Sequence, residues 1–299
     1  MRVDPNYVSN LANSLDQTQV NEQQLTAELS SGVRVNSLSQ DPLAAGENVL
    51  LLNQMQRDDS FTQSSSLVTG QLQVADSALG SVVTQLIQAI SLATSANNGT
   101  LNSSDLKSIS NQLAGIRDEV TSLANTNYQG QYIFSGGQTS TAPFTTSNAT
   151  SPATTTYNGD EDIKTLQTPN GQSIQLNLPG DQIFSAGAGN GVFGALNSLI
   201  ADFSGGVASG TAVADTQALS TAMGFVSQQR VAIDNSLSRM TAATEAVSGE
   251  KTQLTVAQTS LMQADVAQVA TQLSLSQAQQ TALEAVISQL GSDDLFSKL

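Results

Sequence analysis

Apolar residues recur at helical spacing over the first 127 residues of the chain. Over Leu106–Leu123 they alternate in steps of three and four, which is typical of the narrow seam of a coiled-coil helix. Upstream, Leu72, Leu79 and Leu86 repeat every seven residues. Asn97–Gly99 separates the two patterns, and Asn and Gly tolerate the left-handed turn that follows a helix. This region is predicted to hold two antiparallel helices of similar length.

The longest repeat lies in the last third of the chain, where six apolar residues are spaced at seven positions throughout. They are Val226, Ile233, Met240, Val247, Leu254 and Leu261. The pattern predicts one long helix, of about 50 Å or more at a rise of roughly 1.5 Å per residue. After Ala264 the register slips, which indicates a joint between two packing environments.

Between these regions the helical period is lost. Four of the six prolines and a run of Thr and Ser over Thr139–Thr156 fall between Gln131 and Gly194. Asn170–Gly171, flanked by short alternating runs, predicts a two-residue hairpin turn. The predicted fold is therefore mainly α with a small β insertion. Both chain ends form a discontinuous antiparallel helical rod of coiled-coil type, with a central β domain at its tip.

Three domains follow from these patterns: a terminal helical domain (1–40 plus 265–299), a helical rod domain (41–130 plus 195–264) and a β insertion domain (131–194). The terminal domain carries its own apolar seam, formed by Leu11, Leu15, Leu25, Leu29, Leu273, Leu283, Ile287 and Leu290. This seam is too small to offset the entropy of ordering both helices in one chain. We therefore expect the terminal domain to be disordered in the monomer and to fold when other copies of the chain cover the seam.

The composition restricts the chemistry. Ten Lys and Arg against 25 Asp and Glu give a formal charge of −15, which argues against a nucleic-acid partner. The absence of Cys and His removes thiolate nucleophiles, imidazole bases and most zinc or haem ligands, and leaves only carboxylates, hydroxyls and ten basic groups for chemistry. Since these form no catalytic constellation in the sequence, we expect no enzyme activity, cofactor, catalytic residue or metal site. Asp160–Asp162 is interpreted as a solvated turn, and Gly189–Gly194 as a loop that leads into a helix rather than a nucleotide site. We expect neither membrane insertion nor a cleaved signal peptide.

Two terminal segments resemble the bacterial flagellin family. Leu29–Asn36 reads Leu-Ser-Ser-Gly-Val-Arg-Val-Asn and is followed by Asp41–Pro42, similar to the family's N-terminal signature. The signature positions are Gly32, Arg34, Asn36, Asp41 and Pro42, and Gln40 stands where the family has a first Asp. Ala264–Leu273 is similar to the family's C-terminal region, and Gly130–Gly137 resembles its hook-associated protein 3 branch.

The resemblance implies a structural, non-enzymatic protein of the junction between the flagellar hook and filament. It would be made in the cytoplasm, exported through the flagellar type III apparatus without a cleaved signal, and located in the extracellular flagellum. The implied partners are other copies of the chain, hook-associated protein 1, flagellin and a cytoplasmic export chaperone. Two alternatives remain open: a flagellin that forms the filament itself, and a surface-display protein whose insertion binds a ligand.

Overall fold

The computed structural model describes residues 5–147, 149, 151–185 and 191–295, with side chains described between residues 9 and 289 of these ranges. They form two compact units, Met1–Arg57 with Gly249–Leu299, and Asp58–Ser248. Helices dominate both units, and the strands are few and short. The mainly α fold with a small β content is therefore confirmed.

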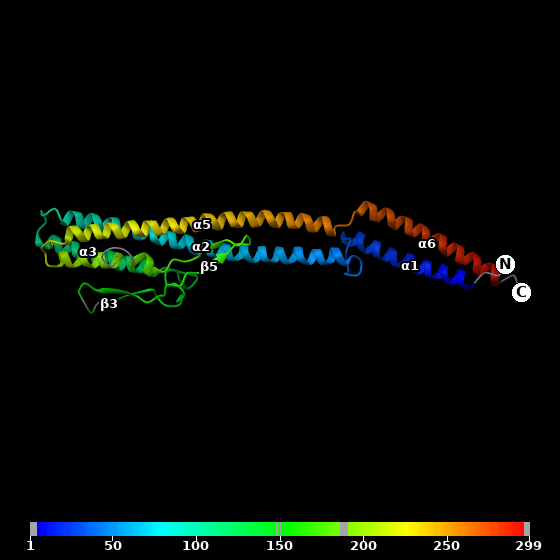
Figure 1. Cartoon of the computed structure of the whole chain (residues 1–299), viewed down its shortest axis with the longest axis horizontal. Coiled ribbons are helices and arrows are strands. Elements are labelled where there is room, and N and C mark those ends of the chain that lie inside the picture. Colours follow the sequence, from blue (N-terminus) through cyan, green and yellow to red (C-terminus); the bar gives the residue numbers. More distant parts are fainter. Residues whose placement is uncertain (1–4, 148, 150, 186–190, 296–299) are drawn as a thin grey trace. The chain divides into compact units, whose positions relative to one another are not determined.

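The first unit is built from chain segments at both ends of the sequence. Helix α1 (Pro5–Ser31) and helix α6 (Val266–Leu295) pack side by side and run in opposite directions (Figure 1). The unit also contains the start of α2 (Pro42–Ala96) and the end of α5 (Ala212–Met262). Side-chain amides link these two ends, since Gln258 donates to Asn48 Oδ1 at 2.9 Å. The break between α5 and α6 coincides with the predicted register slip after Ala264.

The second unit contains the rest of α2 and α5 together with α3 (Ser103–Ala124) and α4 (Gly191–Ser204). Helix α2 ends just before Asn97–Gly99, as the sequence predicts, and Gly99 adopts a left-handed φ of +68°. The prediction of similar lengths is wrong, because α2 has 55 residues and α3 has 22. The side chain of Asn102 caps α3 by accepting from the amides of Ser104 and Asp105.

Helix α5 confirms the prediction of one long helix. It spans 51 residues, which corresponds to about 76 Å at a rise of roughly 1.5 Å per residue. The first four heptad residues, Val226, Ile233, Met240 and Val247, are buried, whereas Leu254 and Leu261 are half-buried. In the second unit, Arg230 and Asp76 join α5 to α2 through an ion pair of 2.8 Å.

The strands form three separate two-stranded antiparallel sheets. The pairs are β1 (Asn127–Tyr128) with β2 (Gln131–Tyr132), β3 (Phe144–Ser147) with β4 (Thr154–Tyr157), and β5 (Thr165–Gln167) with β6 (Ser173–Gln175). The predicted Asn–Gly hairpin is the third pair, but its turn is longer than two residues. Pro169 follows Thr168, and the amide of Gly171 donates back to the Thr168 carbonyl at 2.8 Å. Pro fixes φ for the first central position of the turn, and Gly171 supplies a φ of +78°.

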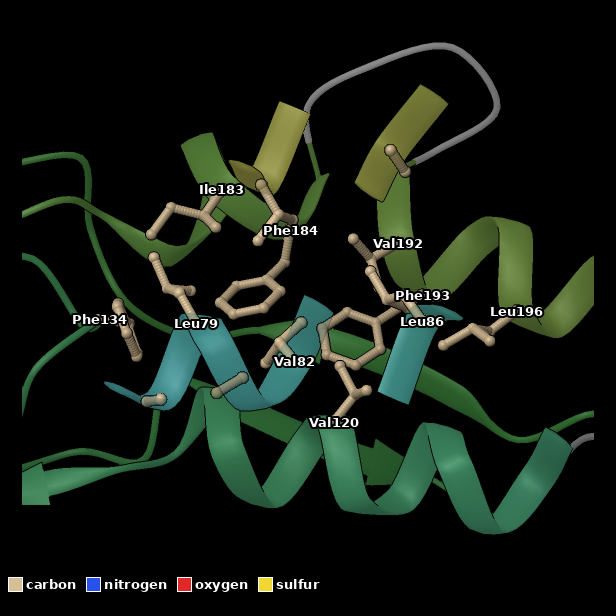
Figure 2. Close-up of a cluster of buried hydrophobic side chains, with 14 of the residues drawn as sticks. Leu79, Val82, Leu86, Val120, Phe134, Ile183, Phe184, Val192, Phe193 and Leu196 are labelled. Atoms are coloured by element: carbon tan, nitrogen blue, oxygen red, sulfur yellow. The ribbon is translucent and has the colours of Figure 1, made fainter. Parts of the chain in front are cut away.

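Aromatic side chains join the irregular segment to the helices. Phe134, Phe144, Phe184 and Phe193 form successive ring contacts with centroids 5.1–5.8 Å apart. Figure 2 shows Phe134, Phe184 and Phe193 beside α2, α3 and α4, close to side chains that include Leu79, Val82, Val120 and Leu196. The second unit therefore has one hydrophobic core to which both helices and irregular segment contribute.

Candidate functional site

The α1–α6 pair carries most of the predicted seam. Leu25 is buried, and Leu29 and Leu273 pack against the small cluster that it forms with Ala264 and Val269. Four other predicted residues, Leu11, Leu15, Leu283 and Ile287, are half-buried on the same two helices. The side chain of Leu290 lies outside the described residues. The structure thus brings α1 and α6 seam residues together within one chain, and contact with other copies stays a prediction.

A groove runs between α1 and α6. Its volume is about 700 Å³, and Ser14, Gln17, Asn21, Ser276 and Leu283 are among its lining residues. Thr18, which interrupts the apolar pattern of the first helix, also lines the groove. The lining side chains are hydroxyls, amides and aliphatic groups, and no charged side chain is among them in the described part of the chain.

The signature residues form the connection between α1 and α2. Gly32 ends α1 with a φ of +68°, which is the left-handed conformation that glycine adopts without strain. Its carbonyl accepts a hydrogen bond of 2.9 Å from the amide of Ala264. Next to it, Val33 pairs with Gln263 in an antiparallel bridge. The loop after α1 is therefore held against the break between α5 and α6.

Arg34 ties this loop to two helix ends. Its Nη1 and Nη2 donate to Asp41 Oδ2 at 3.1 and 3.2 Å, and Nη2 also donates to the Leu261 carbonyl at 3.2 Å. A cation is favourable beside the last carbonyls of a helix, and here that helix is α5. Asp41 in turn accepts from the amide of Ala44 and caps α2, with Pro42 in its first turn. The Ala44 amide and the Arg34 side chain lower the pKa of Asp41 below its usual value.

The side chains of Asn36 and Gln40 form hydrogen bonds with the backbone of the loop itself. Asn36 Nδ2 donates to the Val33 carbonyl at 3.1 Å, whereas Gln40 Oε1 accepts from the amides of Asn36 and Ser37 at 2.7 and 3.1 Å. These two bonds need only an acceptor oxygen, which an amide supplies as well as a carboxylate does. This geometry accounts for Gln40 at a position where the family signature has Asp.

Three features of this site were not visible to sequence reasoning. The contact between Arg34 and Leu261 joins residues 227 positions apart, and a single sequence gives no signal for such a pair. Val35 and Ala44 are buried in or next to the loop, although no periodicity marks them. Ser276 is buried on α6, although serine is a residue type that is mostly exposed.

The described residues offer little catalytic chemistry. They contain no group of three or more Asp, Glu, His or Cys side chains that could hold a metal ion. Asp160 of the acidic run accepts from the Gly137 amide, as part of a turn. Only Gly191–Gly194 of the glycine-rich segment lies among the described residues, and it begins α4. The part of Gly189–Gly194 before Gly191 lies outside them.

Helix α2 is long and apolar enough, by length and composition, to cross a membrane. The relevant window has a mean hydropathy of 1.3, and 33% of it is buried. The core helix of a soluble protein passes the same test, and Leu79, Val82 and Leu86 of α2 are fully buried against other helices. The absence of membrane insertion stays a prediction.

Comparison with known proteins matches the sequence to a flagellar family. The bacterial flagellin N-terminal helical region matches residues 6–139. Flagellar hook-associated protein 3 of Salmonella typhimurium is 32% identical over 187 residues, which cover 62% of this chain and 57% of that protein. Flagellin 1 of Proteus mirabilis is 29% identical over 140 residues, covering 45% and 37%. The chain thus matches little more than half the length of its curated relative.

A solved structure shows the same fold. Hook-associated protein 3 from Legionella pneumophila superposes with a TM-score of 0.62 at 13% identity, covering 71% of this chain and 98% of that one. The match to the flagellin helical region includes α1, the signature loop and α2, which form the site described above. The resemblance seen in the sequence is confirmed: residues 6–139 match the N-terminal helical region of the bacterial flagellins, and the chain is similar in sequence to hook-associated protein 3 of Salmonella typhimurium.

Proposed function

We propose that this chain is a structural, non-enzymatic component of the bacterial flagellum that joins the hook to the filament. The observation that carries this proposal is the 32% identity to a hook-associated protein 3 over 62% of the chain. The match to a flagellin is shorter and weaker, at 29% over 45% of the chain. A filament-forming flagellin is therefore the less supported alternative.

Assembly would proceed through the terminal helices. In this proposal, the half-buried leucines of α1 and α6 complete their burial against neighbouring copies, hook-associated protein 1 and flagellin. The terminal domain, 1–40 with 265–299, would be unfolded in the free chain and bound by an export chaperone before secretion. The apolar seam supports this view, because side chains such as Leu11 and Leu283 are only half-buried within one chain.

The signature loop would set the direction in which the terminal helices leave the rest of the first unit. This role of the loop is supported by the hydrogen bonds that Arg34 donates to Asp41 and to the Leu261 carbonyl. A loop held by such bonds presents α1 and α6 to neighbouring copies in one arrangement.

The proposal is tested by Leu283→Asp in a strain whose own copy has been deleted. A carboxylate on the half-buried seam is expected to abolish incorporation and motility while the second unit keeps its helical circular dichroism signal. Val213→Asp is the matched control, because Val213 is 68% exposed at the start of α5 and should tolerate the same change. Normal motility with Leu283→Asp contradicts assembly through the terminal helices.

The display alternative has its own test. Deletion of Ser147–Asp181 removes β4, β5 and β6 of the irregular segment, and the partner of β3 with them, without touching α1, α6 or the signature loop. If the chain is a junction protein, this deletion variant should lose the structure of its insertion and keep the terminal helices through which it assembles. Retained assembly together with loss of an adhesive or hydrolytic activity would instead favour a display function.

A further inference from the structure

A pocket in the second unit lies between helix α4 and the β3–β4 sheet. Its volume is about 490 Å³, within the range of about 300–1,000 Å³ that is typical of small-molecule sites. The lining residues come from one face of α4 and from both strands of the sheet. Among them are Phe193, Asn197, Ser198, Ala201, Phe144 and Tyr157. The pocket thus combines aromatic rings with uncharged polar groups, and a junction function gives it no role.

Three aromatic side chains form one wall of this pocket. Phe144 and Tyr157 are direct partners in the β3–β4 ladder, with ring centroids 5.2 Å apart, and the Phe193 ring lies 5.1 Å from that of Phe144. The Tyr157 hydroxyl donates to the Asp160 carbonyl at 2.8 Å, so this residue offers a ligand its ring rather than its hydroxyl. Aromatic faces carry partial negative charge and attract the weakly positive C–H groups of a ligand.

The amide of Asn197 is oriented by a buried arginine of the neighbouring helix. Arg117 of α3 is 5% exposed, and its Nη1 donates to Asn197 Oδ1 at 3.4 Å. Because a guanidinium can only donate, the amide oxygen of Asn197 faces Arg117 and Nδ2 faces away from it. Asn197 Nδ2 makes no hydrogen bond with the residues that the structure describes. Its two N–H groups are therefore available to an acceptor in the pocket.

The other polar groups of the pocket narrow the class of ligand. In the described part of the chain no charged side chain lines the pocket, so it offers nothing specific to an ion. Ser198 Oγ has no hydrogen-bond partner among the described residues, whereas Ser204 of the same helix donates to the Ala201 carbonyl at 2.9 Å. A serine hydroxyl both donates and accepts, which suits a ligand whose own polar groups are hydroxyls. A proline-rich peptide also fits aromatic grooves, but its proline amides only accept.

We propose that this pocket binds a neutral saccharide. The C–H face of a sugar ring lies against the wall of Phe144, Tyr157 and Phe193, and a sugar hydroxyl accepts from Asn197 Nδ2. This inference goes beyond the proposed function and does not depend on it, because every described lining residue belongs to the second unit and neither terminal helix contributes one.

Binding is tested by saturation-transfer NMR on the full, unassembled chain. The probes are glucose, galactose and mannose, each compared with its uronic acid. At least one neutral sugar should receive saturation from the aromatic protons of the protein and should have a lower Kd than its uronic acid, because the carboxylate gains no partner and is repelled by the net charge of −15. Oligomers of the sugar that binds then distinguish the source: a polysaccharide ligand predicts tighter binding than the free sugar, and a free-sugar ligand does not.

The site is assigned with two variants and a matched control. Asn197→Asp keeps an acceptor for Arg117 and removes both N–H donors, so the Kd should rise by about 2- to 12-fold for the loss of one net hydrogen bond. Asn111→Asp makes the same change at an exposed position of α3 outside the pocket and should leave the Kd unchanged. Ala201→Trp places a large side chain at the exposed edge of the pocket, away from the core, and should abolish binding. Circular dichroism checks that each variant is folded.

Three results would overturn the inference: no saturation transfer to any neutral sugar, tighter binding of the uronic acids, and wild-type affinity in the folded Asn197→Asp and Ala201→Trp variants. A proline-rich peptide that binds where all of the sugars fail would assign the pocket to a peptide and also overturn it. None of these results bears on hook–filament assembly, which the motility of Leu283→Asp tests separately.

Discussion

Phe184→Ala probes whether the irregular segment and the helices of the second unit share one core. Phe184 has no exposed surface, and its ring contacts Phe134, Phe144 and Phe193 at centroid distances of 5.8, 5.3 and 5.8 Å. Truncation of a buried Phe to Ala costs about 3–5 kcal/mol of unfolding free energy, because it removes buried area and leaves a cavity.

The lower free energy of unfolding should appear as a lower melting temperature of the helices of the second unit, α2 to α5. Phe184 itself lies in the irregular segment, outside these helices. A unit of this size loses about 2–4 °C of melting temperature per kcal/mol, so the expected decrease is about 6–20 °C. Thermal unfolding is followed by far-ultraviolet circular dichroism, which reports mainly on α2, α3 and α5. Ile163→Ala is the matched control within the same segment, because Ile163 is 49% exposed and should change stability by less than about 0.5 kcal/mol.

An unchanged helical melting temperature in Phe184→Ala would refute the shared core. It would mean that the segment folds as a separate domain, with boundaries near those expected from the sequence, 131–194. A local loss of near-ultraviolet signal from Tyr157, without a shift in helix melting, would lead to the same conclusion.

Two further perturbations test single contacts. Gly32→Ala should destabilise the assembled protein by about 1 kcal/mol in urea dissociation, because the φ of +68° is strained for alanine and the terminal domain that contains Gly32 is proposed to order on assembly. Gly46→Ala within α2, where an added Cβ meets no atom within 4 Å, should instead stabilise it by about 0.5–1 kcal/mol; equal effects would contradict the left-handed turn. Burial raises the pKa of Tyr157 to about 12, so the folded state favours the neutral phenol, and the stability it contributes is present below pH 10 and lost between pH 10 and about 12. The stability of Tyr157→Phe should therefore fall less between pH 10 and about 12 than that of the wild type. Identical pH profiles of melting temperature for the two proteins would contradict the raised pKa of Tyr157.

Local periodicity was sufficient to predict the long helices. The heptad from Val226 to Val247 is buried as expected, because a seven-residue repeat places side chains on one face of a helix whatever the partner is. The turn at Asn170–Gly171 was found for a similar reason, since its signal lies within a few residues. The Asn–Gly pair alone does not reveal the extra residue of the turn, because Pro169 lies before that two-residue signal.

The remaining features depend on contacts between distant segments. Strands of two to four residues, such as β1 and β3, are too short for alternation to show, so the first two sheets are predicted only as part of a β region. The burial of Phe184 against α2 and the bond from Arg34 to Leu261 each join segments that no local pattern relates. The burial of Ser276 is not predictable for the same reason, because the sequence does not show whether a serine on a helix faces water or another helix.

The position of the protein on the cell-surface appendage tests the central claim most directly. A copy with a small tag in the turn at Asn170 is expressed in place of the wild type, and gold label is located on isolated appendages by electron microscopy. The proposed function predicts label confined to a short zone between hook and filament. Label along the whole filament, or none on the appendage, would contradict it.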